Sequence, residues 1–286
     1  MSGPSAIAIK RTIGGNVSTS ENKPTRRTAI AGAGIAAAGS LMGTTTGQAQ
    51  TTGKTFVLVH GAWHGGWCWR RVADLLEKKG HKVYAPTLTG LCDRSHLLDS
   101  KTNLSTHVTD VVNLIKWEGL KDVVLVGHSY GGFVISGVAE KAQPSISSIV
   151  YLDAFLPDNG EALVDAVSGS KLYEVIQAAI QKGDLTMPAP KSALFQVNEK
   201  DQAWVDEKCT PQPTATLSEK LALSGARDRI AKRAYIRAKG YASPGFDRAQ
   251  AKAQTATGYR VYEMPCGHDA MVDMPDRLTD ILLEVA

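Results

Sequence analysis

The chain has 286 residues, of which 43% are hydrophobic and 21% are charged, and it carries a formal net charge of +4 at pH 7. This composition is that of a globular protein with enough apolar material for one large core. The charge is small and partly confined to the first 30 residues, so it does not indicate nucleic-acid binding. After residue 50 no apolar run reaches the roughly 18 residues that a membrane span requires, and we expect the folded part to be soluble.

The N-terminal segment is typical of an export signal. Arg26 and Arg27 precede an uncharged stretch rich in alanine, glycine and isoleucine, residues 29–43, and residues 47–49 form a small-x-small pattern. We therefore predict a twin-arginine-type signal peptide at residues 1–49 and an exported mature chain, periplasmic or secreted, that begins at residue 50. The alternatives are a disordered basic tail and a buried helix rich in alanine and glycine.

The first half of the folded part alternates short apolar runs with stretches that have helical spacing. Gly80 is a suitable end for the first helix, and Pro86 stops the second strand. The pattern predicts strands at 55–59, 81–85, 123–126 and 149–152, and helices at 66–79, 104–117 and 132–141. Continuous apolar strands that alternate with helices predict an α/β fold with a mostly parallel sheet and helices on both faces.

Residues from about 157 to 228 interrupt this alternation with prolines, Gly183 and helical fragments, and we interpret them as an inserted helical lid. The alternation resumes with strands at 234–237 and 259–264, a helix at 246–256 and a last helix from Pro275. The predicted domain therefore spans residues 50–286, with a lid insertion at about 157–228.

The motif G-x-S-x-G, typical of a nucleophile, lies at Gly127-His-Ser129-Tyr-Gly131, where the predicted strand has to turn sharply into the predicted helix. At such a turn a serine hydroxyl is exposed at the end of the sheet, next to backbone N–H groups of a helix N-terminus. A structural serine is the alternative when the motif stands alone. Because a strand and a helix flank it here, we predict that Ser129 is a catalytic nucleophile.

A serine hydroxyl needs a base at neutral pH, and His268 is our prediction for that base. It lies in Cys266-Gly-His268-Asp269, directly after the last predicted strand, where a loop can return an imidazole to the carboxyl edge of the sheet.

The glycine-rich loop after the first strand, residues 60–66, is the expected source of an oxyanion donor. We assign one donor to the N–H of Tyr130 and the other to the N–H of Ala62, with the N–H of Trp63 as the alternative. A plain tight turn would explain the glycines of this loop but not their coincidence with the nucleophile motif.

Three segments together resemble one branch of the α/β-hydrolases, the branch of plant methyl esterases, hydroxynitrile lyases and bacterial esterases. They are Val57-Leu-Val-His-Gly-Ala-Trp-His-Gly-Gly-Trp67, Gly127-His-Ser-Tyr-Gly131 and Gly267-His-Asp-Ala-Met271. The resemblance covers about residues 54–286. It implies an α/β-hydrolase fold with a helical cap and a cofactor-free hydrolysis of a small-molecule ester, or a related acyl compound, through an acyl-serine.

The triad acid is where the chain departs from the plant pattern. That pattern has an aspartate after the penultimate strand, and here the place reads Ala238-Lys-Gly-Tyr241. Asp153 follows the strand after the nucleophile helix, a place that resembles the acid position of pancreatic-type lipases, and we predict it as the acid. Asp247 and Asp269 are the alternatives.

The cyanohydrin-lyase activity of the same branch is disfavoured. Those enzymes resemble this chain but have a threonine where Gly61 stands and a lysine where Asp269 stands. We therefore predict a carboxylic-ester hydrolase. The alternatives are an amidase, carbamate hydrolase or lactonase with the same triad, and a ligand-binding protein that keeps the fold without turnover.

The four cysteines show no C-x-x-C spacing, so we predict neither a metal site nor a redox pair, and the resemblance implies that no cofactor is needed. In an oxidising compartment these cysteines could pair as disulfides, and free buried thiols are the alternative. The sequence leaves the substrate and the oligomeric state open.

Overall fold

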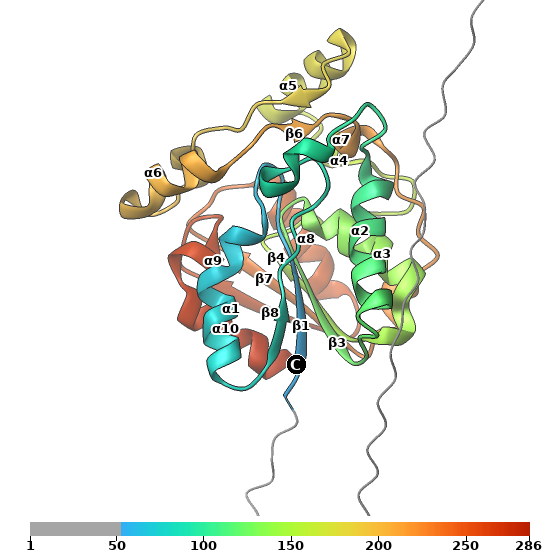
Figure 1. Ribbon diagram of the computed structural model, residues 1–286, viewed down its shortest axis with the longest axis vertical. Coiled ribbons are helices and arrows are strands. Elements are labelled where there is room, and N and C mark those ends of the chain that lie inside the picture. The colour runs from blue at the N-terminus through green and yellow to red at the C-terminus, as the bar shows by residue number, and fades with distance from the viewer. Residues whose placement is uncertain (1–52) are drawn as a thin grey trace, which may run out of the picture. The chain divides into compact units, whose positions relative to one another are not determined.

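A computed structural model describes residues 53–286 of the chain (Figure 1). The predicted signal peptide, residues 1–49, lies outside the described residues. Within the described part, the helices are too short or too polar to cross a membrane.

The predicted parallel sheet is present and has six strands in the order β2-β1-β3-β4-β7-β8. All five pairings between neighbouring strands are parallel. Since parallel strands point the same way, their carboxyl ends form a single edge, and this edge carries the site described below. The strands are β1 (Thr55–Val59), β2 (Lys82–Tyr84), β3 (Val123–His128), β4 (Ile146–Leu152), β7 (Lys232–Ala238) and β8 (Tyr259–Met264).

Helices cover both faces of the sheet, as the α/β prediction requires (Figure 1). On one face α1 packs against α10, and on the other α2 packs against α3, while α8 contacts β7 and β8. The first predicted helix differs in detail, because it opens with a 3-10 turn at Gly66–Trp69 before α1 begins. The helices are α1 (Arg70–Lys78), α2 (Leu104–Trp117), α3 (Gly131–Ala142), α8 (Pro244–Thr255), α9 (Ala270–Asp273) and α10 (Pro275–Val285).

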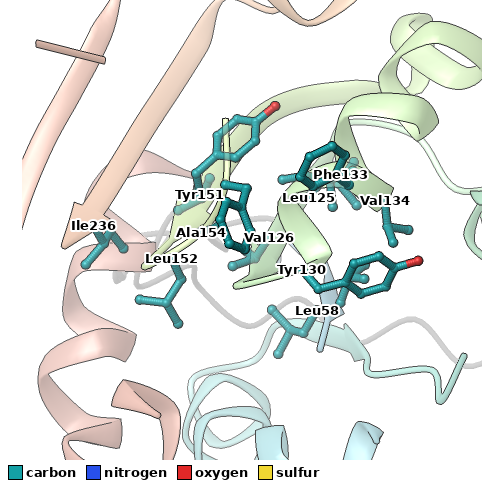
Figure 2. Close-up of a cluster of buried hydrophobic side chains, with 14 of the residues drawn as sticks. Leu58, Leu125, Val126, Tyr130, Phe133, Val134, Tyr151, Leu152, Ala154 and Ile236 are labelled. Atoms are coloured by element: carbon teal, nitrogen blue, oxygen red, sulfur yellow. The ribbon is translucent and has the colours of Figure 1, made fainter. Parts of the chain in front are cut away.

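The core lies against the two central strands β3 and β4, where side chains from α3 meet the sheet (Figure 2). Leu125, Val126, Phe133 and Leu152 are fully buried there. Burial of a side chain of this size contributes about 1.5–3 kcal/mol, so the junction between β3 and α3 is held firmly in place. This junction is the turn that contains Ser129.

Residues between β4 and β7 form a cap at the carboxyl edge of the sheet (Figure 1). Its strands β5 and β6 pair as a short antiparallel ribbon that the sequence pattern did not predict, since each strand has two residues. The cap elements are α4 (Leu163–Ala166), α5 (Lys171–Lys182), β5 (Thr186–Met187), a 3-10 turn at Ser192–Phe195, α6 (Glu199–Lys208), β6 (Gln212–Pro213), α7 (Ala215–Ser218) and a 3-10 turn at Ala226–Arg229.

Candidate active site

Ser129 occupies a strained turn between β3 and α3. Its φ is +55°, a value that non-glycine residues rarely adopt and that is found where surrounding structure enforces it. The turn needs glycine nearby, because a Cβ on Gly127 would lie 2.7 Å from the carbonyl oxygen of Gly131. The packed surroundings of the turn therefore hold the Ser129 side chain at the carboxyl edge of the sheet, where it lines a pocket.

His268 lies in the loop between β8 and α9 and lines the same pocket as Ser129. Its backbone N–H donates to the carbonyl of Phe195 in the cap at 2.9 Å, and its ring stacks on Phe246 with a centroid distance of 5.0 Å. In the described residues no hydrogen bond joins the Ser129 hydroxyl to the His268 ring. Such contacts are often long in ligand-free sites and tighten when substrate binds.

Asp153 is the carboxylate that contacts His268. The Nδ1–H of His268 donates to Oδ2 of Asp153 at 2.6 Å, and Asp153 is fully buried at the end of β4. A carboxylate at Nδ1 fixes the tautomer in which Nε2 has a free lone pair, so Nε2 can accept a proton. The structure thus places Asp153 where a triad acid has to be.

Arg237 is a residue of this site that the sequence reasoning missed. Its Nη1 donates to Oδ1 of Asp153 at 2.7 Å, and the N–H of Ala238 donates to the same oxygen at 3.0 Å. Burial alone would lower the pKa of Arg237, but the Asp153 charge raises that pKa above its ordinary value. A signal was present in the sequence: an arginine at the end of an apolar strand must find a partner when it is buried.

The two alternative acids have other partners. Asp247 is half-exposed, and its Oδ1 accepts from Nε of Arg237 at 3.0 Å. Asp269 is fully buried, and its Oδ2 accepts from Nε2 of His64 at 3.0 Å. Neither carboxylate therefore accepts a hydrogen bond from Nδ1 of His268 in this structure.

The backbone geometry favours Ala62 over Trp63 as the second oxyanion donor. The N–H of Trp63 already donates to Oε1 of Gln212, on β6 of the cap, at 2.9 Å. The N–H groups of Ala62 and Tyr130 have no hydrogen-bond partner within residues 53–286, and both residues line the pocket. Two free amides that line the same pocket as Ser129 are suited to bind the oxyanion of an acyl transfer.

The pocket has a volume of about 520 Å³, within the range of small-molecule sites, and its walls are mostly apolar. Phe155 also lines it. Trp204 packs on Trp67 and Leu156 is part of the buried core. Apolar lining residues come from α4 and the residue after it, from α5, from β5 and from α7: Leu163, Val167, Leu172, Ile176, Met187 and Leu217.

We assign no metal to the one group of donors in the described residues that could hold an ion, namely His128, His268 and Asp269. The Nε2 of His128 donates to the carbonyl of His268 at 3.1 Å, while Nδ1 of His268 and Oδ2 of Asp269 bind the partners given above. All four cysteines are free thiols.

This fold, with a serine at the strand-to-helix turn and a histidine and carboxylate beside it, defines a hydrolase of the α/β class. The chain belongs to the alpha/beta hydrolase family, whose model matches residues 56–281.

Similar proteins and a similar solved structure belong to the same class. A carbendazim hydrolyzing esterase from Nocardioides sp. (strain SG-4G) is 44% identical over 236 residues, which are 79% of this chain and 97% of the relative. Putative methylesterase 11 of Arabidopsis thaliana is 30% identical over 247 residues, 81% of this chain and 63% of the relative. An extracellular alpha/beta-hydrolase from a Paenibacillus species superposes with a TM-score of 0.72 and 27% identity, covering 82% of this chain and 99% of the other. The chain is accordingly an esterase-type hydrolase of this superfamily.

Proposed function

We propose that the protein is a serine esterase that cleaves a small carboxylic ester through an acyl-serine intermediate. The observation that carries the proposal is the 2.6 Å hydrogen bond between Nδ1 of His268 and the buried Asp153, in a pocket that Ser129 also lines. This bond orients the free Nε2 of His268 as a general base.

The reaction follows from these positions. Oγ of Ser129 attacks the ester carbonyl while Nε2 of His268 accepts the hydroxyl proton, and the N–H groups of Ala62 and Tyr130 bind the oxyanion that forms. The imidazolium of His268 then gives its proton to the leaving alcohol. A water molecule, deprotonated by the same nitrogen, attacks the acyl-serine. The bond from the acyl carbon to Oγ of Ser129 then breaks, His268 returns the proton to Oγ, and the acid is released.

The pocket favours an uncharged, apolar substrate, since its walls are mostly aliphatic and aromatic side chains. A carbamate ester is the second candidate, because a carbendazim hydrolyzing esterase is 44% identical to this chain. Carbamate and carboxylic esters pass through the same kind of oxyanion, so the same residues would serve both.

A fluorophosphonate probe tests the nucleophile directly. We expect the wild-type protein to be labelled and Ser129→Ala to stay unlabelled while folded. Hydrolysis of p-nitrophenyl acetate, a series of methyl esters and carbendazim by both proteins then separates the substrate classes. A folded wild-type protein that is not labelled and cleaves none of these compounds would contradict the proposal and favour a ligand-binding protein.

We further propose that the protein is exported, on the strength of the Arg26-Arg27 pair and the uncharged segment that follows. Expression with its N-terminus intact should yield a mature chain that begins at Gln50, which mass spectrometry detects. Replacement of both arginines by lysine should keep the precursor inside the cell, and unchanged export of that variant would contradict the assignment.

A further inference from the structure

The loop that supplies the Ala62 amide contains a buried histidine for which the proposed mechanism has no use. We propose that His64 is a positioning residue, held as an imidazolium by Asp269, that joins the oxyanion loop (residues 61–64) to the loop that carries His268. This inference deepens the proposed esterase function and rests on it.

The protonation of His64 follows from its hydrogen bonds. Nδ1 lies 2.8 Å from the carbonyl oxygen of Ala62, and Nε2 lies 3.0 Å from Oδ2 of Asp269. Both partners are acceptors only, so both ring nitrogens have to carry a proton. The ring also stacks on Trp67 with a centroid distance of 5.3 Å, which suits a cation over an aromatic face.

The charges around the pair are consistent with this assignment. Burial alone would lower the pKa of His64, but the charge of Asp269 and its hydrogen bond raise that pKa well above the ordinary value. The other titratable groups near His64 are Sγ of Cys209 at 3.9 Å, the ring of His128 at 6.1 Å between centroids, His60 and Cys92. Burial lowers the pKa of His128 well below its ordinary value, so His128 adds no competing positive charge.

His64 holds the peptide next to the oxyanion donor. The Ala62–Trp63 peptide is fixed at both ends, since its carbonyl accepts from His64 and its N–H donates to Gln212. Trp63 has a φ of +66°, a conformation that persists only where neighbours enforce it. Without the imidazolium this peptide can rotate. The N–H of Ala62, which precedes it in the chain, then no longer points toward the oxyanion.

Asp269 connects His64 to the loop that carries His268. It follows His268 directly in the chain, and one of its carboxylate oxygens lies within 4.8 Å of a ring nitrogen of His268. His64 and Asp269 are 205 residues apart in sequence and both almost fully buried. One ion pair therefore ties the two halves of the catalytic machinery together, so we expect its removal to lower the rate of acylation more than substrate affinity.

The test compares His64→Gln, Asp269→Asn and the double variant with the wild type, using p-nitrophenyl acetate. We expect each single variant to lose about 10- to 100-fold in kcat with KM within threefold, below the 100- to 1,000-fold typical of losing an oxyanion donor outright. Because the pair acts as a unit, the double variant should be no slower than the slower single variant. A trifluoromethyl ketone forms an oxyanion on Ser129. Its binding to each variant should weaken by the same factor by which kcat/KM falls.

His96→Gln and Asp280→Asn make the same chemical changes at exposed positions and should keep wild-type kinetics. Histidine-labelled wild-type protein gives an independent measurement, because ¹⁵N NMR at pH 8 should show one imidazole with both nitrogens protonated and slow proton exchange. Asp269→Asn should remove that signal.

Three results decide the matter. A wild-type protein without esterase activity or fluorophosphonate labelling would refute the proposed function, and this inference with it. An active wild type whose folded His64→Gln variant keeps kcat within threefold would refute only the positioning role. Absence of a doubly protonated buried imidazole in the wild-type spectrum would do the same, even if the variants do not fold.

Discussion

Replacing Asp153 by asparagine tests the chemistry of the site most directly. Oδ1 of Asp153 accepts from both Arg237 and the N–H of Ala238, so the amide oxygen of an asparagine has to occupy that position. The NH₂ group is then forced toward Nδ1 of His268, 2.6 Å from the present Oδ2. Because two donors cannot face each other at that distance, His268 has to shift its proton to Nε2 and can no longer accept one from Ser129.

The expected loss in kcat is about 10,000-fold, the order seen when a triad acid is replaced by its amide, which corresponds to about 5.5 kcal/mol of activation free energy. The free energy of unfolding should fall by less than the 3–5 kcal/mol typical of a broken buried ion pair. The reason is that Arg237 still donates to Asp247 and to the carbonyl of Tyr241. Initial rates with p-nitrophenyl acetate and urea unfolding measure the two effects separately.

Asp247→Asn is the matched control, since it also removes a carboxylate bound to Arg237 but does not contact His268. We expect this control to keep kcat within a few-fold of the wild type. An Asp153→Asn variant that is folded and retains more than a tenth of the wild-type kcat would refute the tautomer argument and assign the acid role elsewhere.

Three further predictions concern the oxyanion loop, the buried histidines and the pocket. A Cβ at Gly61 would lie 2.9 Å from Cβ of Ser129, so Gly61→Thr should abolish esterase turnover without producing cyanohydrin cleavage, and cyanide release from mandelonitrile is the check. Burial lowers the pKa of His60 to about 3 and that of His107 to about 4, so both are neutral in the folded protein and protonated when unfolded below about pH 6.5. The free energy of unfolding should therefore fall as the pH drops from 6.5 to 4, by up to about 1.4 kcal/mol per pH unit for each histidine, and a urea series showing no decline contradicts this. Ile176→Ala widens the apolar wall on α5 and should lower KM for longer esters while leaving that for acetate unchanged, as a p-nitrophenyl ester series would reveal.

Local patterns were enough to predict the fold and to single out side chains that meet at the candidate site. Apolar runs such as residues 123–126 predicted the buried strands, because a strand covered on both faces has no polar side to show. The motif at Ser129 and the chain position of His268 predicted two side chains that the structure places around one pocket. Asp153 was predicted from its place at a strand end, and the structure adds the contact with Nδ1 of His268.

The sequence by itself determined the alternation of buried strands and helices and the strand-to-helix turn at Ser129, since each depends on residues close together in sequence. Only the tertiary structure decided which acceptor each histidine nitrogen faces. Asp153 and His268 are 115 residues apart, and His64 and Asp269 are 205 apart, so no local pattern couples them. Arg237 and Gln212 follow the same rule: a buried polar side chain has to find a partner, and which partner it finds depends on how distant strands and loops pack.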